Sequence, residues 1–122
     1  MEKKEYVRRM AIIANAECYE GVGNLQGKTT LLLELIETTG AKRGQVLEKR
    51  YTFEGSPPDY LCRDMLRLGY VAESLEKLKE ITKQLIGIVV RVSLTQDGDA
   101  LNVYIDDYYG RDNPTKYEAA NR

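Results

Sequence analysis

Tyrosines and cations lie close together in two parts of the chain. Lys49 and Arg50 directly precede Tyr51, and Arg91 lies upstream of a tyrosine-rich segment that contains Tyr104, Tyr108 and Tyr109. Flat rings beside positive charges on a β surface suit single-stranded nucleic acid, because bases stack on the rings and cations neutralise phosphates. The structural alternative is that each tyrosine packs half-buried at a sheet margin with its hydroxyl in water.

Residues that could carry out catalysis are scarce. The 122 residues include no histidine, so the commonest general base and metal ligand is missing. Asp97 and Asp99 are explained by a turn, whereas Asp106 and Asp107 point to opposite faces of one strand. Cys18 and Cys62 fall in different expected elements and are expected to be free thiols. The sequence therefore predicts a protein that is not an enzyme and uses no metal or cofactor.

A glycine-rich stretch superficially resembles a phosphate-binding loop. Gly27-Lys28-Thr29 ends it, but the position that requires the upstream glycine holds Val22. The spacing of Gly21, Gly23 and Gly27 is one residue too long for a dinucleotide fingerprint, and a strand follows where a helix is required. We interpret both matches as chance.

Composition indicates one globular domain. Hydrophobic residues make up 43% and charged residues 30% of the chain, and the net charge is −1. A near-neutral chain has no overall attraction for nucleic acid, so such binding would depend on a local basic patch. No apolar run is long enough to span a bilayer and no signal peptide is evident, which predicts a cytoplasmic protein without a membrane partner.

Hydrophobic periodicity predicts a mainly β chain with a helical insertion (an α+β class). Strands are expected over 10–20, 28–38 and 45–53, followed by helices over 57–68 and 72–85. Ser56 and Pro57 are suited to the cap and first residue of the first helix. We expect a charged N-terminal arm over 1–9, one domain over 10–110 and a flexible tail over 111–122.

A β-hairpin from Ile88 to Tyr108 completes the expected sheet. Asp97-Gly98 is a favoured central pair for a type I′ turn. A turn centred there places Leu94 opposite Leu101, Val92 opposite Val103 and Val90 opposite Ile105, with all six side chains on one face. On the other face it pairs Arg91 with Tyr104.

The order of three strands, helices and a final hairpin is that of the OB-fold, a five-stranded Greek-key barrel that commonly binds oligonucleotides. The sequence also resembles a family of phage and prophage single-stranded-DNA-binding OB-fold proteins. Three stretches carry the resemblance: 43–51, with a glycine, an apolar pair and a basic pair; 61–69, which ends in Leu-Gly; and 85–92 together with 102–108.

The resemblance implies that DNA lies across the second, third and fifth strands. Transferred residue by residue, the implied nucleic-acid-binding set is Lys28, Arg43, Lys49, Arg50, Tyr51, Arg91 and Tyr104. Two features depart from single-strand binders of this kind: the chain has no acidic C-terminal tip, ending in Asn121-Arg122, and it is nearly neutral. Modest affinity with a steep salt dependence follows.

We therefore expect a sequence-tolerant single-stranded-DNA-binding protein of phage-type replication or recombination, in the cytoplasm of a bacterial host cell. Small chains of this kind often act as homodimers. The alternative is an OB-fold interaction module or inhibitor, of the phage counter-defence type, whose partner is a host protein. The near-neutral charge and acid-rich helices are compatible with that alternative.

Overall fold

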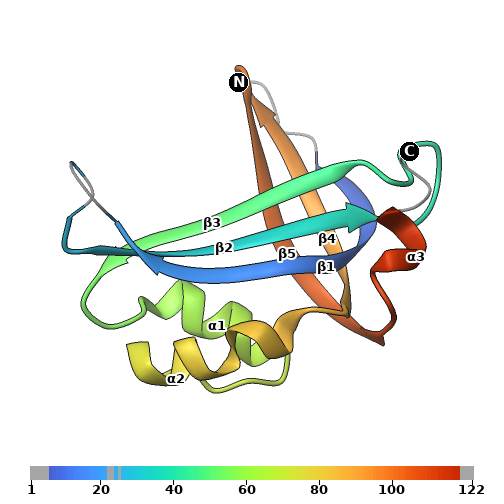
Figure 1. Ribbon diagram of the computed structural model, residues 1–122. Coiled ribbons are helices and arrows are strands. Elements are labelled where there is room, and N and C mark those ends of the chain that lie inside the picture. Colours follow the sequence, from blue (N-terminus) through green and yellow to red (C-terminus); the bar gives the residue numbers. More distant parts are fainter. Residues whose placement is uncertain (1–5, 22–23, 25, 119–122) are drawn as a thin grey trace.

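The computed structural model describes residues 6–21, 24 and 26–118. Its strands form one antiparallel sheet in the order β3-β2-β1-β4-β5 (Figure 1). They are β1 (Val7–Glu20), β2 (Lys28–Glu37), β3 (Val46–Glu54), β4 (Ile88–Asp97) and β5 (Ala100–Arg111). β3 and β5 are the two edges and do not pair with each other, so the sheet is not closed.

Helices α1 (Asp59–Arg67) and α2 (Leu75–Ile81) and the 3₁₀ helix η2 (Thr82–Leu85) connect β3 to β4, and α3 (Thr115–Glu118) follows β5. The predicted mainly β class, with helices between the third and fourth strands, is confirmed. At nine residues, α1 is the longest helix in the described part of the chain, and none there could cross a bilayer.

The first helix begins later than predicted. Pro58, not Ser56, precedes its first residue, and no side chain caps it. The reason is that a residue before proline is held out of the helical region, so Pro57 cannot start a helix when Pro58 follows. The second helix begins at Leu75, where the side chain of Ser74 accepts a hydrogen bond of 3.2 Å from the amide of Lys77.

β1 belongs to both halves of the sheet. It pairs with β2 from Ala11 to Glu20 and with β4 from Val7 to Ile12. The register with β2 shifts between Ile13 and Asn15, which makes Ala14 a bulge residue. A bulge bends and twists its strand, and in Figure 1 the β4–β5 hairpin rises steeply from the β1–β2–β3 layer.

The core lies between the sheet and the helices α1 and α2, which cover one side of it (Figure 1). Alternate residues of the strands face it, as the period of two requires. Leu31, Leu33 and Leu35 of β2 are fully buried, and so are Leu61 and Met65 of α1. The helices thus supply the apolar surface that a one-sided sheet needs.

The hairpin forms, but its expected register is wrong by two residues near the turn and, beyond a bulge at Asp106, by three or more. Gly98 and Asp99 are the turn residues, and Leu94 pairs with Val103 rather than with Leu101. Gly98 has a φ of 62° and Asp99 does not have a positive φ, which is the pattern of a type II′ turn with glycine first. A shift of two leaves every side chain on its face, so the apolar pattern could not distinguish the registers.

The corrected register also changes the expected polar pairs. Arg91 pairs with Asp107, and Tyr104 pairs with Ser93. Five of the six predicted inward-facing aliphatic residues are buried, whereas Leu101 is 41% exposed near the tip of the hairpin.

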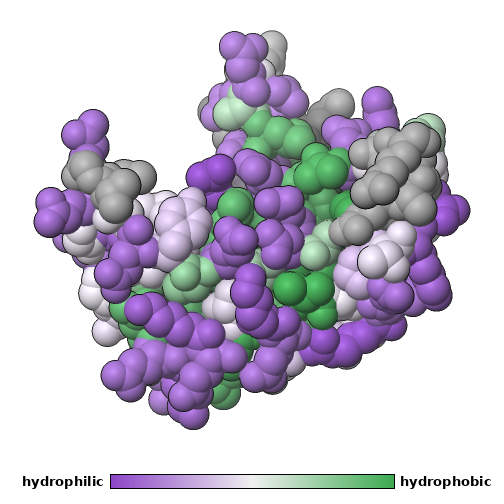
Figure 2. Space-filling view, in the orientation of Figure 1, coloured by the Kyte–Doolittle hydropathy of each residue, from purple (hydrophilic) through white to green (hydrophobic). Residues whose placement is uncertain are grey.

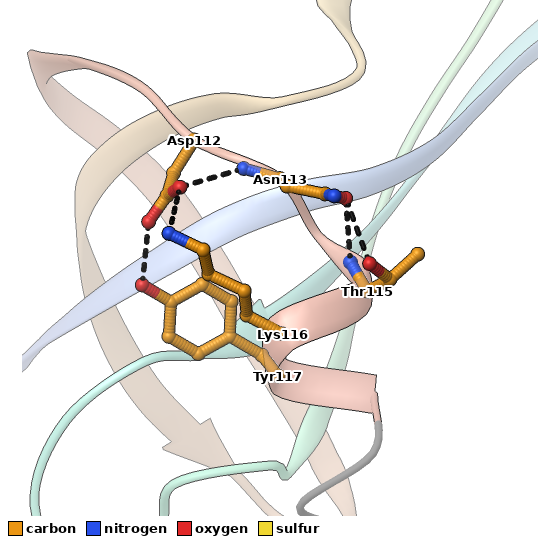
Figure 3. Close-up of polar contacts among 5 residues, drawn as sticks. All are labelled: Asp112, Asn113, Thr115, Lys116 and Tyr117. Carbon is orange, nitrogen blue, oxygen red and sulfur yellow. Dashed lines mark hydrogen bonds and ion pairs between the residues drawn. The ribbon is translucent and has the colours of Figure 1, made fainter.

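The segment expected to be a flexible tail is structured as far as residue 118. α3 packs against β2 at its C-terminal end, and Asp112 organises the turn before it (Figure 3). The carboxylate of Asp112 accepts hydrogen bonds from Lys116 at 2.8 Å, the amide of Asn113 at 2.8 Å and the hydroxyl of Tyr117 at 3.0 Å. These hydrogen bonds lower the pKa of Asp112 to about 2, and the bond from Lys116 has the largest effect. Residues 119–122 lie outside the described part.

The expected N-terminal arm is likewise shorter, because β1 already begins at Val7. Residues 1–5 of that arm lie outside the described part.

A chain of polar contacts through α1 joins the two unpaired edges of the sheet. The hydroxyl of Tyr51, on β3, donates a hydrogen bond of 2.6 Å to Asp64. Arg67 bonds the same carboxylate at 3.0 Å and donates to the backbone oxygen of Ile105, on β5, at 3.2 Å. Burial, followed by the negative charge and hydrogen bond of Asp64, raises the pKa of Tyr51 far above its ordinary value.

We predict that Tyr51→Phe lowers the free energy of unfolding by about 1–3 kcal/mol, since it leaves a half-buried carboxylate oxygen without its donor. Urea unfolding measures the loss. Tyr60→Phe is the matched control, because Tyr60 stacks on Tyr51 at 6.0 Å but is 50% exposed. An equal effect of the two substitutions would contradict the prediction.

The same tyrosine predicts a pH dependence. Its pKa is raised in the folded state, so above pH 10 the unfolded chain releases a proton that the folded chain retains. The free energy of unfolding should therefore fall as the pH rises past about 10, and it should fall less steeply in Tyr51→Phe. Urea unfolding at pH 8 to 11 measures this dependence. If the native protein and Tyr51→Phe lost unfolding free energy in parallel over that range, Tyr51 would not contribute to the pH dependence.

Candidate nucleic-acid interface

Lys49 and Tyr104 meet where β3 and β5 approach each other. The Lys49 ammonium lies 5.2 Å from the centre of the Tyr104 ring and 5.1 Å from that of Tyr51. Tyr6 also lies next to Tyr104, with ring centres 6.1 Å apart and planes tilted by 59°. We call Tyr6, Lys49 and Tyr104 the aromatic site. Tyr6 and Tyr104 are 59% and 42% exposed, so both rings are accessible to a flat ligand.

The position of Lys49 in the sheet explains its unusual environment. It is paired with Leu33 and lies on the same face as Leu47 and Tyr51, which is the core face. Only the unpaired edge of β3 lets its ammonium reach outward to Tyr104. Burial lowers the pKa of Lys49 below its ordinary value, and the charge of Asp64 partly opposes this shift.

Two of the predicted residues, Arg50 and Tyr51, lie on opposite faces of β3. Tyr51 is 1% exposed, so its ring is not available to stack on a base and its role is in the core. Arg50 lies on the outer face of β3, where it contacts the hydroxyl of Tyr19 at 3.5 Å and the carboxylate of Glu48 at 3.5 Å. Tyr19 could not be selected from the sequence, because its partner Arg50 is 31 residues away and meets it only across β2.

The outer face of β1–β2–β3 is acid-rich. The register places four glutamates on this face against two cations. The glutamates are Glu17, Glu34, Glu48 and Glu54, and the cations are Lys28 and Arg50. The resemblance implied that DNA crosses β2, β3 and β5, and the charge of this face of β2 and β3 does not suit a phosphate backbone.

Arg91 belongs to a different group of cations. With Arg8, Arg9 and Lys42 it lines a hollow of about 630 Å³ between the β1–β4 pair and the loop that joins β2 to β3. We call this hollow the basic cleft. Met10, Thr39, Gly40 and Ala41 complete its lining. Arg8 and Arg9 were placed in the N-terminal arm by the sequence, and only their pairing with β4 brings them to Arg91.

The other two predicted residues lie apart from both sites. Lys28 begins β2 and is paired with Glu54. Arg43 lies in the β2–β3 loop with its guanidinium 5.5 Å from the centre of the Tyr117 ring. The structure therefore brings Lys49 together with Tyr104 and with the buried ring of Tyr51, and does not gather the other predicted residues around them. Both cysteines are free, as expected, and both are half-buried.

Figure 2 shows the molecular surface hollowed between the rising β4–β5 hairpin and the body below it. Hydrophobic and hydrophilic residues alternate over this concave region. Lys49 and Tyr104 come from the two strands that border it. A concave, chemically mixed surface of this kind is the usual setting for ligand recognition.

Comparison with known proteins adds a partial likeness. No protein-family model matches the chain, and no solved structure matches it. The chain is similar to UBA domain-containing protein 7 of Schizosaccharomyces pombe, at 28% identity over 103 residues. That region is 84% of this chain and 14% of the relative, so the likeness is to one segment of a much longer protein.

We predict that the pKa of Lys49, followed by NMR of its side-chain Cε, lies below the ordinary value of 10.5. Asp64→Asn should lower it further, because the aspartate charge is what favours the ammonium. Asp59→Asn, an exposed position on the same helix, is the control. If the pKa of Lys49 were 10.5 or higher, the half-buried placement of Lys49 would be wrong.

Proposed function

We propose that this protein binds single-stranded DNA without strong sequence preference and without catalysis, as the resemblance to phage-type single-strand binders implies. The observation that carries the proposal is the aromatic site. Two accessible tyrosine rings lie next to each other, with a lysine ammonium over one of them. Such a group stacks on any base, because every base has a π face, and it offers a charge to the neighbouring phosphate.

The proposal includes an OB-type, partly open barrel. The strand order, the helices between β3 and β4, and the side-chain contacts across the β3–β5 gap support it. In such a barrel an oligonucleotide crosses the strand face near the β1–β2 and β4–β5 loops. Tyr104 on β5 and Lys49 on β3 lie on that route, whereas the acid-rich outer face of β1–β2–β3 favours a path displaced toward β5.

Binding should be weak and strongly dependent on salt. The net charge is −1, so only local cations attract the strand, and each phosphate contact adds to the slope of affinity against salt. Dimerisation and a role in replication or recombination remain parts of the proposal inherited from the resemblance.

The test is the fluorescence anisotropy of labelled oligo-dT, titrated at about 50 and 200 mM salt. We expect binding at low salt that weakens at the higher concentration. Tyr104→Leu should weaken it by about fivefold or more, since loss of one stacked base costs about 1–3 kcal/mol. Tyr109→Leu is the matched control, because Tyr109 lies on the same strand and is 54% exposed. No anisotropy change at tens of micromolar protein and low salt would refute the proposal.

A second candidate is recognition of a protein. The acid-rich outer face of β1–β2–β3, with its four glutamates, favours a partner with a basic surface. A pull-down from host lysate that yields one dominant protein and survives nuclease treatment would favour this candidate. Loss of that protein in a Glu34→Gln/Glu48→Gln variant would locate the contact, whereas Tyr104→Leu should leave it unchanged.

A further inference from the structure

The basic cleft combines cations from three segments that are far apart in the sequence. Arg8 and Arg9 come from β1, Lys42 from the β2–β3 loop and Arg91 from β4. The register fixes their arrangement. Arg8 is paired with Ser93, and the adjacent outward-facing pair is Met10 with Arg91, so Arg8 and Arg91 lie on one face at neighbouring rows.

Two of the four cations are already compensated. The Arg9 Nε lies 2.9 Å from Glu37, and Arg91 forms an ion pair with Asp107. Burial raises the pKa of Glu37, and the charges of Arg9 and Lys42 oppose the rise. Within the described ranges, Arg8 and Lys42 form no ion pair, so the cleft retains an excess of positive charge that an anion could neutralise.

The loop that carries Lys42 is held in a compact shape. Gly40 has a φ of 78°, a conformation that side chains disfavour. The amide of Arg43 bonds the oxygen of Gly40 at 3.2 Å, and that of Gln45 bonds the oxygen of Lys42 at 2.9 Å. The ring of Tyr117 lies against Arg43 at 5.5 Å. Lys42 is therefore presented from a fixed loop, not from a long unstructured segment.

The cleft is aligned with the aromatic site. Arg8, Ser93 and Tyr104 form one row across β1, β4 and β5 and face the same way. Neighbouring strands are about 4.8 Å apart, so the backbones of Arg8 and Tyr104 are separated by about 10 Å. A stacked strand covers that distance in about three nucleotides, at 3.4 Å per nucleotide.

We propose that the basic cleft is a phosphate-binding site, with Arg8 and Lys42 as the principal contacts. Resting on the proposed function, we infer that it holds backbone phosphates of the same strand whose bases stack at Tyr104. The strand would then cross the outer face of β5 and β4 toward β1, where the carboxylates of Asp106 and Asp107 are bonded to Ser93 and Arg91, and so avoid the acid-rich face of β1–β2–β3. Free inorganic phosphate carries the same charged oxygens as a backbone phosphate, and it is the alternative ligand for the basic cleft.

Two other hollows in the described part of the chain offer less of this chemistry. One of about 720 Å³ near the β1–β2 end has one ionisable residue in its described lining, Glu20, which pairs with Lys79 at 3.5 Å. Another, of about 420 Å³, adjoins the cleft and shares Arg9 and Lys42 with it, but Val7, Leu94 and Leu101 make its lining more apolar and its buried carboxylate Glu37 would repel a phosphate.

The test uses the full chain, labelled with ¹⁵N, and two probes at low ionic strength: inorganic pyrophosphate and oligo-dT. We expect both to shift the amide signals of Gly40, Ala41 and Lys42. The double variant Arg8→Gln/Lys42→Gln should lose the pyrophosphate response, and its slope of log affinity for oligo-dT against log salt should be smaller by about 1.4. Arg63→Gln/Lys77→Gln, which removes two exposed helical charges, should change neither.

Three outcomes decide the matter. Shifts with both probes support the site and the path of the strand. Shifts with pyrophosphate alone support a phosphate site but overturn its use by nucleic acid. If neither probe shifts these signals, the site is overturned. It is also overturned if the double variant behaves like its control. Tyr104→Leu tests the aromatic site separately from the basic cleft. This variant should weaken the binding of oligo-dT and leave the pyrophosphate response intact.

Discussion

The contact on which the rest of the structure depends is the hydrogen bond between Tyr51 and Asp64. It ties edge strand β3 to α1, and Arg67 extends the connection to the backbone of β5. No ladder hydrogen bonds join these two strands, so side chains of one short helix set the separation between them. Because Asp64 also influences the charge state of Lys49, the same carboxylate connects the packing of the core to the electrostatics of the aromatic site.

Most of the architecture could be predicted from local patterns, and the differences have identifiable causes. Strand alternation indicated all five strands because apolar residues recur with a period of two. The hairpin register could not be fixed in that way, since a shift of two residues preserves every face and only the turn conformation at Gly98 decides it. The structured segment after β5 was missed because its order comes from Asp112 and from packing on β2, which are tertiary contacts.

The candidate site was harder to predict than the fold. Residue type alone grouped Tyr51 with Tyr104, yet one is a buried hydrogen-bond donor and the other an exposed ring. Lys49 was selected as a surface cation, but it is a core-face residue that reaches solvent only because β3 is an edge. Arg8 and Lys42 gave no signal, as a cleft built from distant segments becomes visible only when the strands are paired. A resemblance to a family indicates which positions to compare. The net charge of a sheet face depends on all the residues that lie on it.

The bulge at Ala14 has a consequence for how sequences of this type can vary. Before it, odd-numbered residues such as Ala11 and Ile13 face the core, and after it even-numbered residues such as Ala16 and Cys18 do so. Deletion of Ala14 would therefore keep every side chain on its face while straightening β1. The β4–β5 hairpin would then flatten toward the plane of β1–β2–β3, and the concave surface between them would become shallower. An insertion at the same point would also keep every side chain on its face, but it would shift half of β1 by two residues relative to β2 or enlarge the bulge, so a deletion and an insertion here have different consequences.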